Sequence, residues 1–77
     1  MSESNLLGER IAELRNDLGL TKATLSRKTG VTQHTIIKLE SGTVKNPSFL
    51  VMMRLSEIFN VSMDSWVNIM EQMHPKE

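Results

Sequence analysis

The chain has 77 residues, 39% of them hydrophobic and 23% charged, and its nine basic and nine acidic side chains give a formal net charge of zero. This length allows one small domain, and the composition is that of a folded domain. Without cysteine and with only two histidines, the chain lacks the ligands of a four-ligand metal site, so we predict no metal and no cofactor. The longest apolar run, from Phe49 to Met53, is far shorter than the roughly 20 residues that span a membrane. Because the acidic, polar start is also no signal peptide, we predict a cytoplasmic protein without a membrane partner.

The first predicted helix begins at Leu7. From there, apolar residues recur every three or four positions as far as Leu18, which is the spacing of one stripe on an amphipathic helix. Gly19 is predicted to end this helix, and Leu20 to fold back over its end.

Two short helices are predicted next. The hydroxyl of Thr21 is placed to cap a helix over residues 22–29, which Gly30 ends. Thr32 is placed in the same way before a helix over residues 33–41.

The last two predicted helices follow a short polar loop. Asn46 is predicted to cap a helix whose first residue is Pro47 and whose last is Phe59, with Asn60 in a left-handed conformation after it. Ser62 is predicted to cap the final helix. That helix carries a wide apolar stripe, formed by Met63, Trp66, Val67, Met70 and Met73.

The predicted architecture is therefore a single all-α domain of five helices over residues 1–77. We expect its core to cover about residues 6–70 and the tail at residues 74–77 to fray. The four glycines are predicted to mark helix ends or turns: Gly8, Gly19, Gly30 and Gly42.

The second and third helices, with the turn between them, have the layout of a helix-turn-helix over residues 22–41. Each special position of such a unit holds a suitable residue type: a small residue where the helices cross, a glycine in the turn, an apolar residue that fills the corner, and two apolar anchors on the second helix. These are Ser26, Gly30, Val31, Ile36 and Leu39.

Charge is unevenly distributed along the chain. Residues 21–45 hold five basic side chains and one acidic one, a local net charge of +4, whereas the remainder carries −4. A basic segment that includes a helix-turn-helix favours a nucleic-acid partner, although mixed surface charges also cluster by chance.

The segment from Leu18 to Gly42, the pair Asn46-Pro47, and residues 59–64 (Phe-Asn-Val-Ser-Met-Asp) resemble the phage repressor/Cro (XRE) family of helix-turn-helix DNA-binding proteins. The resemblance extends over about Leu7 to Val67. It implies a lambda-repressor-like fold of five helices, usually a homodimer, which binds double-stranded DNA at a partly palindromic operator. It also implies a bacterial or phage source.

In this family the second motif helix enters the major groove with its N-terminal residues at the base edges. The matching positions, and therefore the predicted base contacts, are Thr32, Gln33, His34, Ile37 and Lys38. Glutamine can pair with adenine, lysine can donate to guanine, and Ile37 can pack on a thymine methyl group. The alternative for the polar residues is an ordinary solvated surface, and for Ile37 a single exposed apolar side chain.

The resemblance also implies contacts that position the protein on the DNA backbone without specifying sequence. The predicted backbone contacts are Lys22, Thr35, Lys45, Asn46 and Ser48. Lys22 stands where the family often has glutamine, so it retains a phosphate contact and loses the amide. Arg15 and Glu40 match a family pair that forms an internal salt bridge, for which we predict a structural role.

Apolar residues near the C-terminus exceed what so small a domain can bury, which predicts a protein partner there. The predicted homodimer interface is Met63, Val67, Met70 and Met73. Two alternatives remain: methionines at helical spacing are often core residues, and a different protein, such as a toxin neutralised by its repressor, would use the same face.

The sequence has no cysteine, no histidine and carboxylate at a plausible local spacing, and no phosphate-binding glycine loop, so we predict that the chain is not an enzyme. The predicted function is a dimeric, sequence-specific transcriptional repressor. The alternative is a protein-interaction module that has lost DNA binding and retains the interface near its C-terminus.

Overall fold

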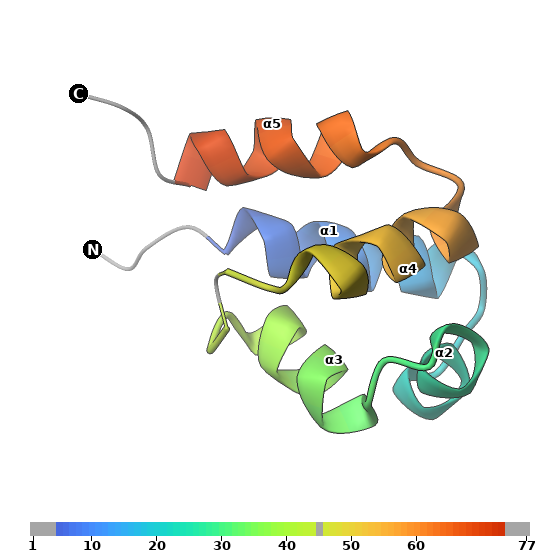
Figure 1. Cartoon of the computed structure of the whole chain (residues 1–77). Helices are drawn as coiled ribbons and strands as arrows, with labels where there is room; N and C mark the ends of the chain where they lie inside the picture. Colours follow the sequence, from blue (N-terminus) through green and yellow to red (C-terminus); the bar gives the residue numbers. More distant parts are fainter. Residues whose placement is uncertain (1–4, 45, 74–77) are drawn as a thin grey trace.

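The computed structural model describes residues 5–44 and 46–73, which form five α-helices and no strand (Figure 1). The helices are α1 (Leu6–Asp17), α2 (Lys22–Thr29), α3 (Gln33–Ser41), α4 (Phe49–Phe59) and α5 (Met63–Met73). The all-α prediction is confirmed. Two of the predicted positions, Lys45 and the tail at 74–77, lie outside the described residues.

A hydroxyl side chain precedes each of the last four helices and accepts a hydrogen bond from a backbone amide of the first turn, which would otherwise lack a partner. The caps predicted for α2, α3 and α5 are confirmed. The bonds run from the Thr24 amide to Thr21 (3.0 Å), from Thr35 to Thr32 (3.2 Å), from Val51 to Ser48 (3.2 Å) and from Ser65 to Ser62 (3.3 Å).

The predicted start of α4 is wrong by two residues. Ser48, not Asn46, caps this helix, and Phe49 is its first residue. Pro47 did not decide between the two starts, because a residue without an N–H group needs no partner either inside the first turn or just before it.

Two details of α1 also differ from prediction. The helix ends at Asp17, so Leu18 lies beyond it and is exposed, while Leu20 packs against the core as predicted. Gly8 is not a helix end: it is buried inside α1, where a Cβ atom would stand 2.4 Å from the carbonyl oxygen of Leu39 in α3. Gly8 therefore permits a close approach of α1 and α3.

The hydrophobic core takes residues from all five helices and from the turn between α2 and α3. The most deeply buried side chains recur every three or four positions along the helices, as expected for the apolar stripes predicted from the sequence. The buried core is Leu7, Ile11, Leu25, Val31, Ile36, Leu39, Met52, Leu55, Phe59 and Trp66.

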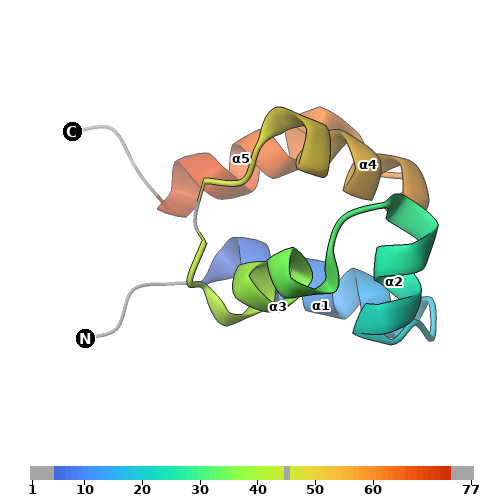
Figure 2. The same cartoon turned by 60° about the horizontal axis from the view of Figure 1, so that its bottom comes forward.

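The helices are arranged so that α3 and α5 both pack on α1, from opposite sides, and α2 packs on α3 and α4 (Figures 1 and 2). The helix-turn-helix and α5 consequently occupy opposite sides of the domain. None of the helices within residues 5–44 and 46–73 has the length and hydropathy of a membrane-spanning segment.

Candidate nucleic-acid interface

The turn between α2 and α3 fixes the orientation of α3 relative to α2. Gly30 ends α2 with a φ of 79°, a left-handed conformation that favours glycine, and Val31 then buries its side chain in the corner. The buried hydroxyl of Thr29 donates to the Leu25 carbonyl (2.8 Å) and accepts from the Val31 amide (3.1 Å). The turn is therefore held by side-chain hydrogen bonds as well as by packing.

The inward and outward faces of α3 are sharply different. Ile36 and Leu39 are buried, whereas Gln33 and His34 are exposed at the start of the helix. Ile37 is 42% exposed, so it points outward as its position predicted. Lys38 is half-buried on the same helix. The N-terminal half of α3 thus presents an amide, an imidazole and an apolar side chain to solvent.

Two of the predicted contact residues at the start of α3 already use their hydroxyl groups. Thr32 accepts from the Thr35 amide and donates to the Thr35 hydroxyl at 2.8 Å. Of the four polar residues among the predicted base contacts, Thr32 therefore has the least free hydrogen-bonding capacity, and its methyl group and one lone pair remain for a ligand.

The predicted backbone contacts that the structure describes come from three segments: the start of α2, Thr35 within α3, and the segment before α4. Lys22 is the half-buried first residue of α2, while Asn46 and Ser48 are exposed in the segment before α4. The Ser48 hydroxyl caps α4, so part of its capacity is used within the chain.

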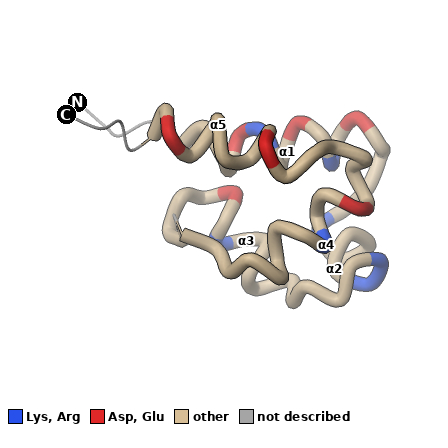
Figure 3. The backbone as a smooth tube through the Cα atoms, turned by 45° about the horizontal axis from the view of Figure 1, so that its top comes forward, with Lys and Arg blue, Asp and Glu red and all other residues tan. Residues whose placement is uncertain are grey.

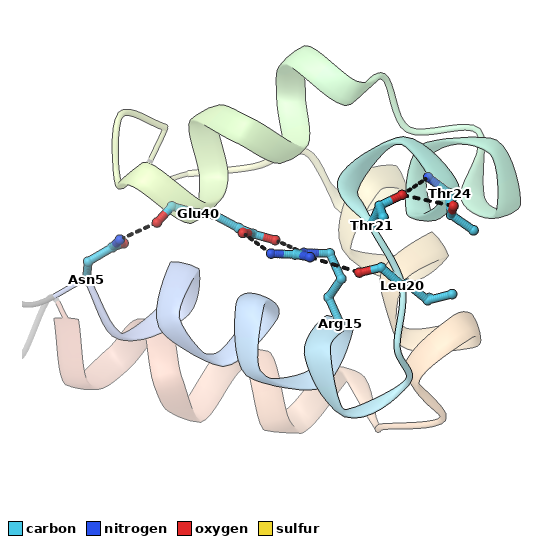
Figure 4. A network of polar contacts seen from close by, with 6 residues as sticks. All are labelled: Asn5, Arg15, Leu20, Thr21, Thr24 and Glu40. Atoms are coloured by element: carbon cyan, nitrogen blue, oxygen red, sulfur yellow. Dashed lines mark hydrogen bonds and ion pairs between the residues drawn. The ribbon is translucent and has the colours of Figure 1, made fainter.

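Arg15 connects three segments of the chain around a carboxylate (Figure 4). Its Nε donates to Oε2 of Glu40 at 2.7 Å and its Nη2 to Oε1 at 3.0 Å, a bidentate pair, while Nη1 donates to the Leu20 carbonyl at 2.8 Å. The Arg15 side chain is only 13% exposed and the Glu40 side chain only 8%. The hydrogen bond to Glu40 raises the pKa of Arg15 above its ordinary value, although burial acts in the opposite direction. These contacts attach α3 to α1 and to the segment before α2.

Two polar residues that support this site, Asn5 and Arg54, were not predicted from the sequence. The Asn5 side chain donates to the Glu40 carbonyl (2.8 Å), which ties the start of α1 to the end of α3. Arg54 of α4 donates to the Thr29 carbonyl (3.3 Å), at the end of α2. An asparagine before a helix suggests a cap, and nothing in the sequence indicated that this one bonds a residue 35 positions away.

The methionines predicted to contact a partner protein pack partly against the core of their own chain. Met63, Met70 and Met73 are half-buried against the core, and Val67 is the α5 residue of this group that remains exposed. The Met63 sulfur accepts from the Ser56 hydroxyl (3.2 Å), which in turn accepts from the Trp66 indole nitrogen.

Charge is distributed unevenly over the helices. Acidic and basic positions are mixed along α1, whereas α5 carries acidic positions and no basic one (Figure 3). The described residues contain no group of three metal-ligating side chains that could hold an ion.

Comparison with known proteins agrees with this geometry. Residues 11–66 match a helix-turn-helix family, a span that includes α2, α3 and α4 entirely. The chain belongs to the XRE family of helix-turn-helix proteins. It is similar to an uncharacterized HTH-type transcriptional regulator of Archaeoglobus fulgidus, with 36% identity over 55 residues, which are 71% of this chain and 77% of that protein. Its family is therefore one of DNA-binding transcriptional regulators.

Proposed function

We propose that this XRE-family chain is a sequence-specific transcriptional regulator that binds a partly palindromic duplex as a homodimer and represses by occupying promoter DNA. The observation that carries the proposal is the outward face of α3. It presents Gln33, His34, Ile37 and Lys38 beside a turn that is rigidly held to the core. Regulators of this kind act by binding, so the proposal needs no catalytic residue and no cofactor.

The roles of individual residues follow from their chemistry. Gln33 is suited to pair with adenine, and Ile37 to pack on a thymine methyl group. Lys22, with the amides at the start of α2, is suited to hold a phosphate. The net charge of +4 over residues 21–45 supplies attraction to the DNA backbone at longer range.

Selection of random duplex DNA by the full chain, at low and near-physiological salt, tests the proposal directly. We expect an inverted repeat that persists at the higher salt. Recovery of no motif, with binding that disappears as salt rises, would instead favour the protein-interaction module and call for capture of a protein partner.

Two substitutions then separate base contacts from backbone contacts. Gln33→Ala should reduce discrimination at one base pair by about 1–3 kcal/mol, whereas Lys22→Ala should weaken binding to all sequences alike and reduce the salt slope by about one. The matched control is Asn68→Ala, which removes an exposed amide from α5 and should leave both quantities unchanged. Equal loss on every sequence with Gln33→Ala would remove Gln33 from the base contacts.

A further inference from the structure

The two ends of α3 are held in different ways. At the C-terminal end, the Glu40 side chain accepts two hydrogen bonds from Arg15, and the Glu40 carbonyl accepts one from Asn5. The N-terminal end, where Gln33 is exposed, is joined to α2 by the turn. The main packing partners of α3 are α1 and α2, whereas those of α4 are α2 and α5. A contact between α4 and the turn is therefore the route by which α4 can hold the start of α3.

Arg54 of α4 makes such a contact. Its Nη1 donates to the Thr29 carbonyl at 3.3 Å, and the same nitrogen lies 3.7 Å from the position that a Cβ atom on Gly30 would occupy. Thr29 is the last residue of α2, so no later turn of that helix offers its carbonyl a partner. A cation is also favoured at this helix end, where the backbone dipoles leave partial negative charge. Both the geometry and the charge of Arg54 thus suit the end of α2.

The side chain of Arg54 lies between two hollows. One, of about 180 Å³, is on the side of α2 and has Lys28 and Glu57 in its wall. The other, of about 190 Å³, is on the side of α3 and has Val31 and Thr32 in its wall. Within residues 5–44 and 46–73, no carboxylate lies within ion-pair distance of Arg54. The bond to the end of α2 is therefore the polar contact that orders this exposed side chain.

We propose that Arg54 is a positioning residue for base discrimination: it holds the turn, and through the turn the start of α3, in the orientation in which Gln33 reaches a base edge. This inference rests on the proposed function, and it does not require Arg54 to touch DNA. Base readout depends on accurate placement of side chains in the groove, whereas attraction to phosphates is independent of sequence. A turn that is ordered before binding spares the specific complex the cost of ordering it.

The proposal is tested by removal of the guanidinium. Arg54→Met removes the charge and the donors but keeps a long unbranched side chain, and at this exposed position the fold should be retained. Affinity is measured for a duplex from the selection and for one in which the selected base pairs are changed. The ratio of the two affinities should fall about 2–12-fold, the equivalent of one net hydrogen bond, while the salt slope is unchanged.

Two further variants accompany this measurement. Arg54→Lys retains a donor on a long side chain and should restore most of the ratio. Arg10→Met removes an exposed arginine charge from α1 and should change neither the ratio nor the salt slope. An unchanged ratio in Arg54→Met would overturn the proposal. A salt slope smaller by about one, with equal loss on both duplexes, would overturn it as well, because Arg54 would then contact a phosphate directly.

A measurement without DNA separates this inference from the proposed function. The Gly30 amide donates to the Ser26 carbonyl (2.8 Å) and the Val31 amide to the Thr29 hydroxyl (3.1 Å). Hydrogen exchange of these two amides should become about 2–12-fold faster in Arg54→Met, while exchange in the middle of α1 and the urea midpoint stay unchanged. Unchanged exchange at both amides would overturn the proposal whatever the result on DNA. If wild type selects no sequence, the proposed function fails, and the exchange data still decide whether Arg54 holds the turn.

Discussion

Replacement of Glu40 by glutamine tests whether the bridge between α1 and α3 is structural. The substitution preserves shape and one acceptor oxygen, but it turns an NH₂ group toward the donating guanidinium of Arg15. One nearly buried hydrogen bond is lost and the arginine charge loses its counter-ion. Breaking a buried pair at one partner costs about 3–5 kcal/mol. Because the remaining acceptor oxygen would retain part of the contact, we expect a decrease of about 2–4 kcal/mol in the free energy of unfolding.

That decrease is large for this domain. At about 0.05–0.15 kcal/mol per residue, 77 residues give a total stability of roughly 4–12 kcal/mol. The melting temperature should fall by about 8–32 °C, at about 4–8 °C per kcal/mol for a domain of this size. Urea unfolding followed by the helical circular dichroism signal measures the free energy of unfolding, and a thermal scan of the same signal measures the melting temperature.

The matched control is Glu71→Gln, which neutralises an exposed carboxylate on α5 and should change stability by less than about 0.5 kcal/mol. A loss below about 1 kcal/mol in Glu40→Gln, or a changed base preference at unchanged stability, would refute the structural assignment.

The pH dependence has a definite sign. A cation whose pKa is raised by folding contributes stability that is complete below its unfolded pKa and is lost only as pH rises through the folded value. Because the hydrogen bond to Glu40 raises the already high pKa of Arg15, its guanidinium stays charged in both states throughout the neutral and mildly alkaline range. The stability difference between wild type and Glu40→Gln should therefore be constant between about pH 7 and pH 10, and a difference that narrows over this range would contradict the assignment.

Two further substitutions test the packing that holds the site. Gly8→Ala should destabilise by about 1–3 kcal/mol because the added Cβ would stand 2.4 Å from the Leu39 carbonyl oxygen, whereas helix propensity alone predicts a gain of about 1 kcal/mol, so the sign decides. Ser56→Ala should cost about 1–3 kcal/mol by leaving the buried Trp66 indole N–H without an acceptor, and should alter tryptophan fluorescence; a loss no larger than that of Ser41→Ala, at an exposed hydroxyl, would show that the indole finds another partner.

The helices and their caps could be predicted from sequence because their causes are local. A threonine or serine followed by an amphipathic stripe specifies a helix start within a few residues, as at Thr21 and Thr32. The start of α4 was missed because two cap residues, Asn46 and Ser48, flank a proline that suits either start.

What could not be predicted depends on residues that meet only after the chain has folded. From the sequence alone, Gly8 suggests a helix boundary and Asn5 suggests a helix cap. In the folded chain, Gly8 instead accommodates the Leu39 carbonyl, and the Asn5 side chain bonds the Glu40 carbonyl. The exposure of Phe49 is of the same kind: a continuous apolar run does not reveal which of its members the core accepts.

The arrangement on α3 suggests how such a domain changes its target without losing its fold. Residues that hold the helix, Ile36, Leu39 and Glu40, point inward, and those proposed to contact bases, Gln33 and Ile37, point outward. Substitutions at exposed positions away from such anchors usually change stability by less than about 0.5 kcal/mol, whereas each base contact is worth about 1–3 kcal/mol of discrimination. Base preference on this scaffold is therefore free to vary at nearly constant stability, provided that the Arg15 bridge and the buried face of α3 are unchanged.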